Sequence, residues 1–220
     1  MSFDKIMSLV GTASLQTLEM VVLSTLFSIV LGLPLGILLC VSDPASGIKP
    51  RPVLYQVLTR IVNALRSFPF IILMIVLFPL SRIIVGTAIG TKATIVPLSI
   101  AAAPFVARVM ESALKEVDSG VVQAARSMGS STWQIIIKVL LPEALPAIID
   151  GITLTIINLI GYSAMAGAIG GGGLGDLAIR YGYQRFRPLI MAIAVVIILV
   201  FVEIIQFCGT KISHRIASKR

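Results

Sequence analysis

Charged residues are scarce in this sequence. Asp, Glu, Lys and Arg make up 13% of the 220 residues and hydrophobic residues make up 57%, whereas a soluble domain averages about 25% charged residues. This composition argues against a soluble globular domain and is typical of an integral membrane protein. The formal net charge of +8 comes from basic residues beside apolar runs, which is the pattern of loop charges that set membrane orientation. We therefore expect contact with membrane lipid and no nucleic-acid partner.

Cysteine and histidine are almost absent. The two cysteines, Cys40 and Cys208, each lie at the end of an apolar run, so a disulfide framework has no support. The one histidine, His214, lies in a basic C-terminal tail. The sequence offers no metal-ligand cluster, no nucleophile–base pair, no paired carboxylates in a common site and no nucleotide-binding loop. We therefore expect no cofactor in this chain and no enzymatic activity of its own.

Long apolar runs dominate what is present. About 20 apolar residues span the hydrocarbon core of a membrane, and the sequence predicts five such spans inside one membrane domain, residues 14–209. A short external segment, 1–13, would precede the domain, and a basic tail, 210–220, would follow it. The predicted spans cover residues 18–42, 55–80, 93–114, 147–168 and 188–209.

The distribution of basic residues predicts the orientation. Twelve of the 18 Lys and Arg residues lie on one side of the membrane if the C-terminal tail is cytoplasmic. Cytoplasmic loops carry the excess of Lys and Arg. The sequence therefore predicts an external N-terminus, a cytoplasmic C-terminus, and a cytoplasmic position for the polar segment 115–146 between the third and fourth spans.

That polar segment contains strong helix-end signals. Asp118 and Ser119 are good N-cap candidates for a first helix over residues 120–128, and Gly129 can take the left-handed conformation that ends a helix. Ser131 and Gln134 have the spacing of a capping box for a second helix that runs to Leu141. We interpret the segment as a helix–glycine–helix unit presented to a partner in water.

One face of the first helix carries small and adaptable apolar residues. Val121, Ala124, Ala125 and Met128 recur at helical spacing, and Met is a flexible surface knob. This face suits docking into a groove of a partner. Packing on the protein's own helices is equally compatible with the spacing.

A resemblance to a known family favours docking. Gln123-Ala124-Ala125, three residues, Gly129, nine residues, Val139, one residue and Leu141-Pro142 resembles the coupling-loop motif of ABC importer permeases. Gln123 stands where the family usually has Glu and Val139 where it has Ile, so an ion pair at position 123 is lost. Segments across the whole chain, such as Ala64–Leu73 and Gly161–Met165, are similar to permease subunits of methionine ABC importers.

The resemblance implies the architecture and the partners. It implies an all-α, five-span permease of the type I importer fold in a bacterial cytoplasmic (inner) membrane, working as a homodimer. Two ATPase subunits, which carry ATP and Mg, would dock on the cytoplasmic segment, and an external lipid-anchored binding protein would deliver L- or D-methionine. The ATPase-coupling residues would be Val121, Gln123, Ala124, Ala125, Met128, Gly129 and Glu143, although Glu143 could instead cap a helix.

Polar residues in the fourth span are candidates for the transport pathway. Asn158, Tyr162 and Ser163 lie close to Met165, and polar groups in a membrane usually face a bundle interior or a pore. Ordinary interhelical hydrogen bonding is the alternative interpretation. By resemblance the segment Tyr162–Met165 lies where the methionine permease narrows its pathway, so we expect a gate there.

Two other functions remain open from the sequence. The permease could import another amino acid, because specificity can reside in the binding protein. A stand-alone, proton-coupled transporter could use Glu203, a carboxylate within the fifth apolar run. Uptake by that transporter would need no ATPase and would collapse with the proton gradient.

Overall fold

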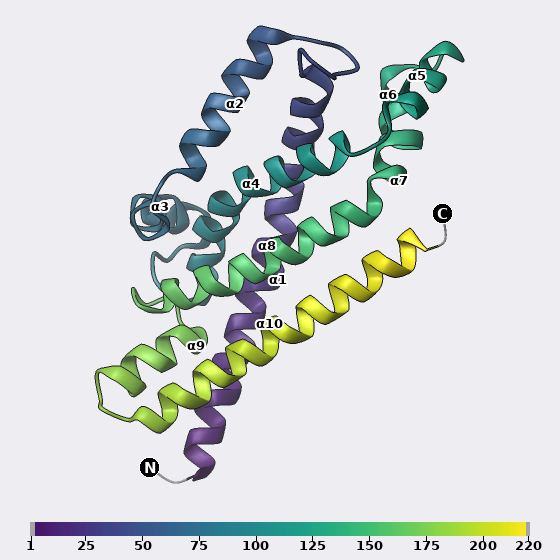
Figure 1. Cartoon of the computed structure of the whole chain (residues 1–220). Coiled ribbons are helices and arrows are strands. Elements are labelled where there is room, and N and C mark those ends of the chain that lie inside the picture. Colours follow the sequence, from purple (N-terminus) through teal and green to yellow (C-terminus); the bar gives the residue numbers. More distant parts are fainter. Residues whose placement is uncertain (1–2, 219–220) are drawn as a thin grey trace. The chain divides into compact units, whose positions relative to one another are not determined.

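The computed structural model describes residues 3–218, and all regular structure in that range is helical (Figure 1). The all-α prediction is confirmed. Helices α1, α2, α3, α4 and α5 span Phe3–Ser42, Pro52–Arg66, Phe70–Val85, Thr91–Lys115 and Ser119–Ser127. Helices α6, α7, α8, α9 and α10 span Thr132–Ile135, Leu141–Glu143, Leu145–Gly167, Gly173–Asp176 and Pro188–Ala217, with π-helical segments η1 (Ile136–Leu140) and η2 (Leu177–Tyr183).

Four helices of the described chain are long and apolar enough to cross a membrane. These are α1, α4, α8 and α10. The pair α2 and α3 passes the same test together but is bent by 102° at the break between its helices. The structure therefore supports an integral membrane protein with four spans, or five if the bent pair counts as one span. The predicted orientation stays a prediction.

The break between α2 and α3 divides the predicted span over residues 55–80 into two helices, and its count as one span stays a prediction. Pro69 precedes α3, and a proline disfavours helical geometry in the residue before it, here Phe68. Ser67 ends α2 and donates its hydroxyl to the carbonyl of Asn63 at 2.9 Å. Apolar residues lie on both sides of this break, so hydropathy predicts one span across it. Hydropathy carries no information about a bend.

The two terminal helices extend beyond the predicted spans. Helix α1 begins at Phe3, so the predicted external segment is helical from there on, and α10 continues to Ala217 through most of the predicted tail. Hydropathy locates the part of a helix that suits lipid, but Lys and Arg are good helix formers and do not end a helix. Residues 1–2 and 219–220, which those two predictions also cover, lie outside the described residues.

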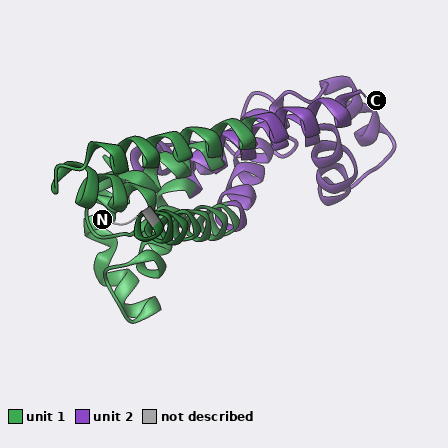
Figure 2. Ribbon diagram, turned by 90° about the horizontal axis from the view of Figure 1, so that it is seen from below, with its two compact units in different colours: residues 1–28, 68–102, 155–206 green, residues 29–67, 103–154, 207–220 purple. Residues whose placement is uncertain are grey.

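The chain divides into two compact units (Figure 2). Unit 1 consists of the described parts of Met1–Ser28, Phe68–Ala102 and Thr155–Gln206, and unit 2 of those of Ile29–Ser67, Ala103–Leu154 and Phe207–Arg220. Helices α1, α4, α8 and α10 each contribute to both units. Unit 1 contains the candidate pathway residues, and unit 2 contains the whole polar segment.

Unit 2 has a core in which the helix backbones approach closely. A Cβ atom at Gly32 of α1 would lie 2.6 Å from the carbonyl oxygen of Ala103, and one at Gly36 would lie 2.7 Å from that of Ala107. Small residues at a crossing allow this approach in membrane helices. The same core includes Met110 and Leu114 of α4 and Leu140 of the polar segment. The polar segment is thus packed directly onto α1 and α4.

Candidate functional site

The first part of the polar segment is the short helix α5, and both of its ends are built as predicted. The Asp118 carboxylate accepts a hydrogen bond from the Gly120 amide at 2.6 Å, which confirms the N-cap. Gly129 has a φ of 78°, and its amide donates to the Arg126 carbonyl at 2.9 Å. The Ser130 amide donates to the Ala125 carbonyl at 3.1 Å. This pair of bonds is a Schellman motif, so the predicted left-handed glycine is confirmed.

The capping box that follows is also confirmed. The Gln134 amide donates to the Ser131 hydroxyl at 3.3 Å, and the Ser131 amide donates to the Gln134 side chain at 2.8 Å. The second helix reaches Leu141 as predicted, but only Thr132–Ile135 of that stretch is α-helical, and the π-helical segment Ile136–Leu140 follows. Pro142 explains the widened turn, since its ring would clash with a carbonyl one α-helical turn earlier.

The predicted coupling residues of α5 differ in how far their side chains are exposed. Val121 is 45% exposed and Met128 is 85% exposed, and Gln123 and Ala124 are exposed as well. Ala125 instead packs with Val122 against the core of unit 2. Ala125 is half-buried, which favours for this residue the alternative of packing on the protein's own helices. We name Val121, Gln123, Ala124 and Met128 the α5 surface.

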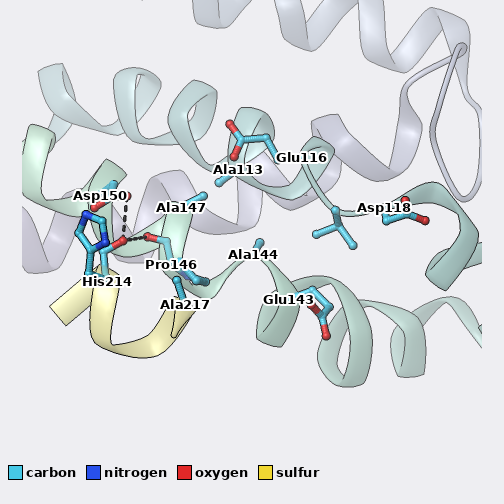
Figure 3. Close-up of a pocket in the computed structure, with 12 residues that line it drawn as sticks. Ala113, Glu116, Asp118, Glu143, Ala144, Pro146, Ala147, Asp150, His214 and Ala217 are labelled. Atoms are coloured by element: carbon cyan, nitrogen blue, oxygen red, sulfur yellow. Dashed lines mark hydrogen bonds between the residues drawn. The ribbon is translucent and has the colours of Figure 1, made fainter. Parts of the chain in front are cut away.

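Glu143 borders an acidic cleft of unit 2 (Figure 3). The cleft has a volume of about 460 Å³. The Ser213 hydroxyl lies at its edge, 2.9 Å from a carboxylate oxygen of Asp150 and 3.2 Å from the carbonyl of Pro146. This contact holds the end of α10 against the start of α8. The charged and titratable residues that line the cleft are Glu116, Asp118, Glu143, Asp150 and His214.

The predicted gate residues of α8 also differ in how far they are exposed. Asn158 and Met165 are exposed, with Met165 at 48%, and Gly161 is exposed between them. Positions separated by three and four residues lie on one side of a helix. We name Asn158, Gly161 and Met165 the α8 face. A polar amide in an apolar span seldom faces lipid, so this face is the candidate for the pathway.

Tyr162 and Ser163 lie elsewhere on α8. The half-buried Tyr162 ring stacks on Phe70 with the ring centroids 4.5 Å apart. Ser163 is buried, and its hydroxyl donates to the Ile160 carbonyl at 2.7 Å. Ser163 therefore does not share the α8 face, which corrects its grouping with Asn158 and Met165. Gly161 on the α8 face and Phe70 beside Tyr162 were not among the predicted residues. The spacing from Asn158 and Met165 could have indicated Gly161, whereas no local signal indicated Phe70.

The glycine-rich chain after α8 is tightly built. The Gly173 amide donates to the Gln16 side chain and the Leu174 amide to the Thr17 hydroxyl, both at 2.9 Å. A Cβ atom at Gly175 would lie 2.2 Å from the Ala164 carbonyl oxygen. The two hydrogen bonds hold α9 against α1, and the close approach at Gly175 places it against the end of α8.

The described chain is thus a helical membrane protein that presents a short, doubly capped helix from a polar segment between two of its spans. These are the features of a transport permease. Residues 28–216 match the family described as "binding-protein-dependent transport system inner membrane component". This match covers most of the chain, and the chain belongs to that family.

Curated relatives are similar over nearly their whole length. The chain is 51% identical over 205 residues to a protein of Vibrio cholerae, covering 93% of this chain and 91% of that one. It is 50% identical over 211 residues to a protein of Pasteurella multocida, covering 96% and 97%. Both are named "probable D-methionine transport system permease protein MetI".

Solved structures agree with the fold. An inward-facing structure of the MetNI methionine ABC transporter matches with a TM-score of 0.95 and 45% identity, covering 98% of this chain and 99% of that one. A chain of an amino acid ABC transporter matches with a TM-score of 0.76 at 21% identity, which shows the fold alone. The predicted importer-permease fold is confirmed, and so is the prediction of a transport subunit rather than an enzyme.

Proposed function

We propose that this chain is the permease subunit of an ATP-driven importer of methionine, both L- and D-isomers, in a bacterial cytoplasmic membrane. The observation that carries the proposal is the similarity at 45–51% identity, across nearly the whole chain, to D-methionine permeases and to a methionine ABC transporter. The motif from Gln123 to Pro142, which keeps the spacing of the family motif, supports the same conclusion, because it begins on the capped, exposed helix α5.

The α5 surface is the proposed docking site for a separate ATPase that binds ATP and Mg. Its small and adaptable residues suit a groove on a partner. Ala125 acts from behind, since it packs α5 onto the core of unit 2. Gly129 ends the helix, and Glu143 lies exposed at the acidic cleft. Gln123 carries no charge, so we expect docking here without an ion pair at that position.

ATP binding by the partner would act on this permease through α5. A ligand shifts an equilibrium only as far as its affinity for the two states differs. Inward-facing and outward-facing states must therefore differ in how α5 contacts the ATPase. Helices α4 and α8, which flank the polar segment in the chain, would carry the movement of α5 into the membrane.

A second copy of the chain is the proposed partner of the α8 face. Asn158 is exposed in the middle of an apolar helix, and an amide there favours a polar or watery neighbour over lipid. Two copies around a two-fold axis would place both α8 faces on a shared pathway. Met165 from each copy would form an apolar closure that excludes water, and Tyr162, held by Phe70, would support it.

Uptake of labelled methionine into proteoliposomes tests the proposal. The vesicles contain this chain, its co-expressed ATPase and the lipid-anchored binding protein, with or without ATP inside. We expect ATP-dependent uptake that unlabelled methionine competes for and other amino acids do not. If another amino acid competes and methionine does not, the chain is still an importer permease, but its substrate is that other amino acid.

The proton-coupled alternative gives a different result in the same vesicles. Uptake without ATP that collapses with the proton gradient would overturn the importer and assign a role to Glu203. Glu203 is exposed on α10 in the single chain, so its environment does not enforce such a role. Glu203→Gln should leave ATP-driven uptake unchanged.

A further inference from the structure

The loop between α1 and α2, residues 43–51, is folded tightly onto the end of α1. The Lys49 amide donates to the Val41 carbonyl and the Arg51 amide to the Ser42 carbonyl, both at 3.0 Å. The Gly47 amide donates to the Asp43 carbonyl at 2.9 Å. A Cβ atom at Gly47 would lie 2.5 Å from two of these carbonyl oxygens. The loop is therefore a compact connector rather than a slack one.

A side chain of α5 holds this loop directly. The Arg126 guanidinium donates to the carbonyl oxygens of Ile48 and Gly47, the latter at 3.4 Å. Ile48 also packs against the same apolar core as Val122 of α5. Polar and apolar contacts thus join the loop to α5 at adjacent points. Arg is suited to this role because its planar guanidinium carries several donors.

The other end of the loop is anchored to α4. Lys115 forms an ion pair with Asp43 at 2.9 Å and with the buried Glu111 at 2.7 Å. The Tyr55 hydroxyl of α2 donates to Glu111 at 3.0 Å. Burial alone would raise the pKa of Asp43, but hydrogen bonds from Lys115, Ala45 and Ser46 outweigh it and hold this pKa below its usual value. The carboxylate thus stays ionised, and the loop is held from α4 as well as from α5.

We propose that the loop 43–51 is a second mechanical connection between α5 and the membrane helices, and that Arg126 is the residue that engages it. Movement of α5 would reach α2 and the end of α1 through the loop, in addition to acting on α1 and α4 by direct packing and on α4 and α8 along the chain. The inference rests on the proposed function, because it assumes an ATPase that moves α5. Neither the chain order nor the coupling motif indicates this connection.

Hydrogen exchange and transport, measured on the same assembled complex, test the inference. The amides of Gly47, Lys49 and Arg51 report on the loop, because each donates an intramolecular hydrogen bond. In the unmodified complex, a non-hydrolysable ATP analogue should change exchange in both α5 and the loop. In Arg126→Met it should change exchange in α5 alone. Methionine imported per ATP hydrolysed should fall about fivefold, the low end for a coupling free energy.

Three further variants separate the connection from general damage. Lys138→Met removes the same charge from the same polar segment, and uptake per ATP should not change. Arg126→Lys keeps a cationic donor and should restore part of the coupling. Gly47→Ala distorts the loop while Arg126 is intact, and it should reproduce the loss seen in Arg126→Met. Co-purification of the ATPase with each variant checks assembly.

The outcomes distinguish this inference from the proposed function. Normal uptake per ATP in Arg126→Met, or a loop that still responds to the ATP analogue in that variant, overturns the connection. Absence of methionine uptake by the unmodified complex overturns the proposed substrate, and the exchange comparison then decides the inference, since it needs no methionine. Failure of any ATPase to bind the chain overturns both.

Discussion

The α5 surface and the α8 face are both exposed in the single chain, but they differ from their surroundings in opposite ways. The α5 surface exposes small and apolar residues, such as Ala124 and Met128, within a polar segment of the chain. The α8 face places a polar residue, Asn158, on a helix otherwise apolar. Each surface differs from its surroundings, and that contrast indicates a partner: a protein in water for α5, and a pathway for α8.

The largest effect should come from the glycine that ends α5. Proline at position 129 cannot adopt a φ of 78° because its ring holds φ near −65°, and it removes an amide donor. We expect Gly129→Pro to abolish ATP-driven uptake. Gly129→Asn is the matched control, since Asn tolerates the left-handed conformation. Equal uptake by the two variants would show that the geometry of the α5 surface does not matter.

Alanine substitutions at two glycines of unit 1 should distinguish an effect on helix packing from an effect on the transport pathway. A Cβ atom at Gly175 meets the Ala164 backbone at 2.2 Å, whereas at Gly161 it meets no atom within 4 Å. Gly175→Ala should destabilise the protein by about 1–3 kcal/mol, as overpacking usually does. Gly161→Ala should unfold at an unchanged or higher temperature but slow uptake. Thermal unfolding in detergent, combined with uptake, measures both, and normal uptake by Gly161→Ala would remove Gly161 from the α8 face.

The capping box should contribute stability more than function. Ser131→Ala removes an acceptor for the Gln134 amide, and the loss of an N-cap costs about 1 kcal/mol. We expect a lower midpoint of thermal unfolding and little change in uptake per ATP, because Ser131 is outside the α5 surface. Ser131→Asp is the control, since Asp is an equally good cap. A clear loss of coupling in both variants would extend the α5 surface toward α6.

Met165→Ala should change the free energy of folding least among these variants, but it should change the passive leak of methionine. Met165 is half exposed, so Met165→Ala removes little packing from unit 1. If Met165 closes the pathway, passive methionine efflux from vesicles without ATP should rise in this variant. Met165→Leu keeps an apolar side chain of similar volume and should stay closed. An unchanged leak in Met165→Ala would mean that the α8 face does not form the closure.

Local signals in the sequence predicted the α5 region well. The Asp118 cap, the left-handed Gly129 and the Ser131–Gln134 box each depend on residues within a few positions of one another, and all three are confirmed. Long-range packing determined two of the features that were missed. The burial of Ser163 and the half-buried position of Ala125 depend on neighbours far along the chain, and spacing alone does not contain them. The bend before Pro69 has a local cause, but hydropathy does not register it. The π-helical turn before Pro142 was not predicted, although the proline was visible in the sequence.

The ionic cluster around Glu111 has a consequence for biosynthesis. Glu111 is only 3% exposed and is neutralised by Arg108 and Lys115, and Tyr55 of α2 completes its hydrogen bonding. Synthesis proceeds from the N-terminus, so Asp43 and Tyr55 are already made when α4 leaves the ribosome. A bare charge costs about 2.5–3.5 kcal/mol at the centre of a membrane helix, and Glu111 lies near the end of α4. Tyr55 is ready to bond Glu111 and Asp43 to pair with Lys115, which reduces the cost of inserting these charges. The order of α1, α2 and α4 in the gene thus suits the order in which a nascent chain can insert them.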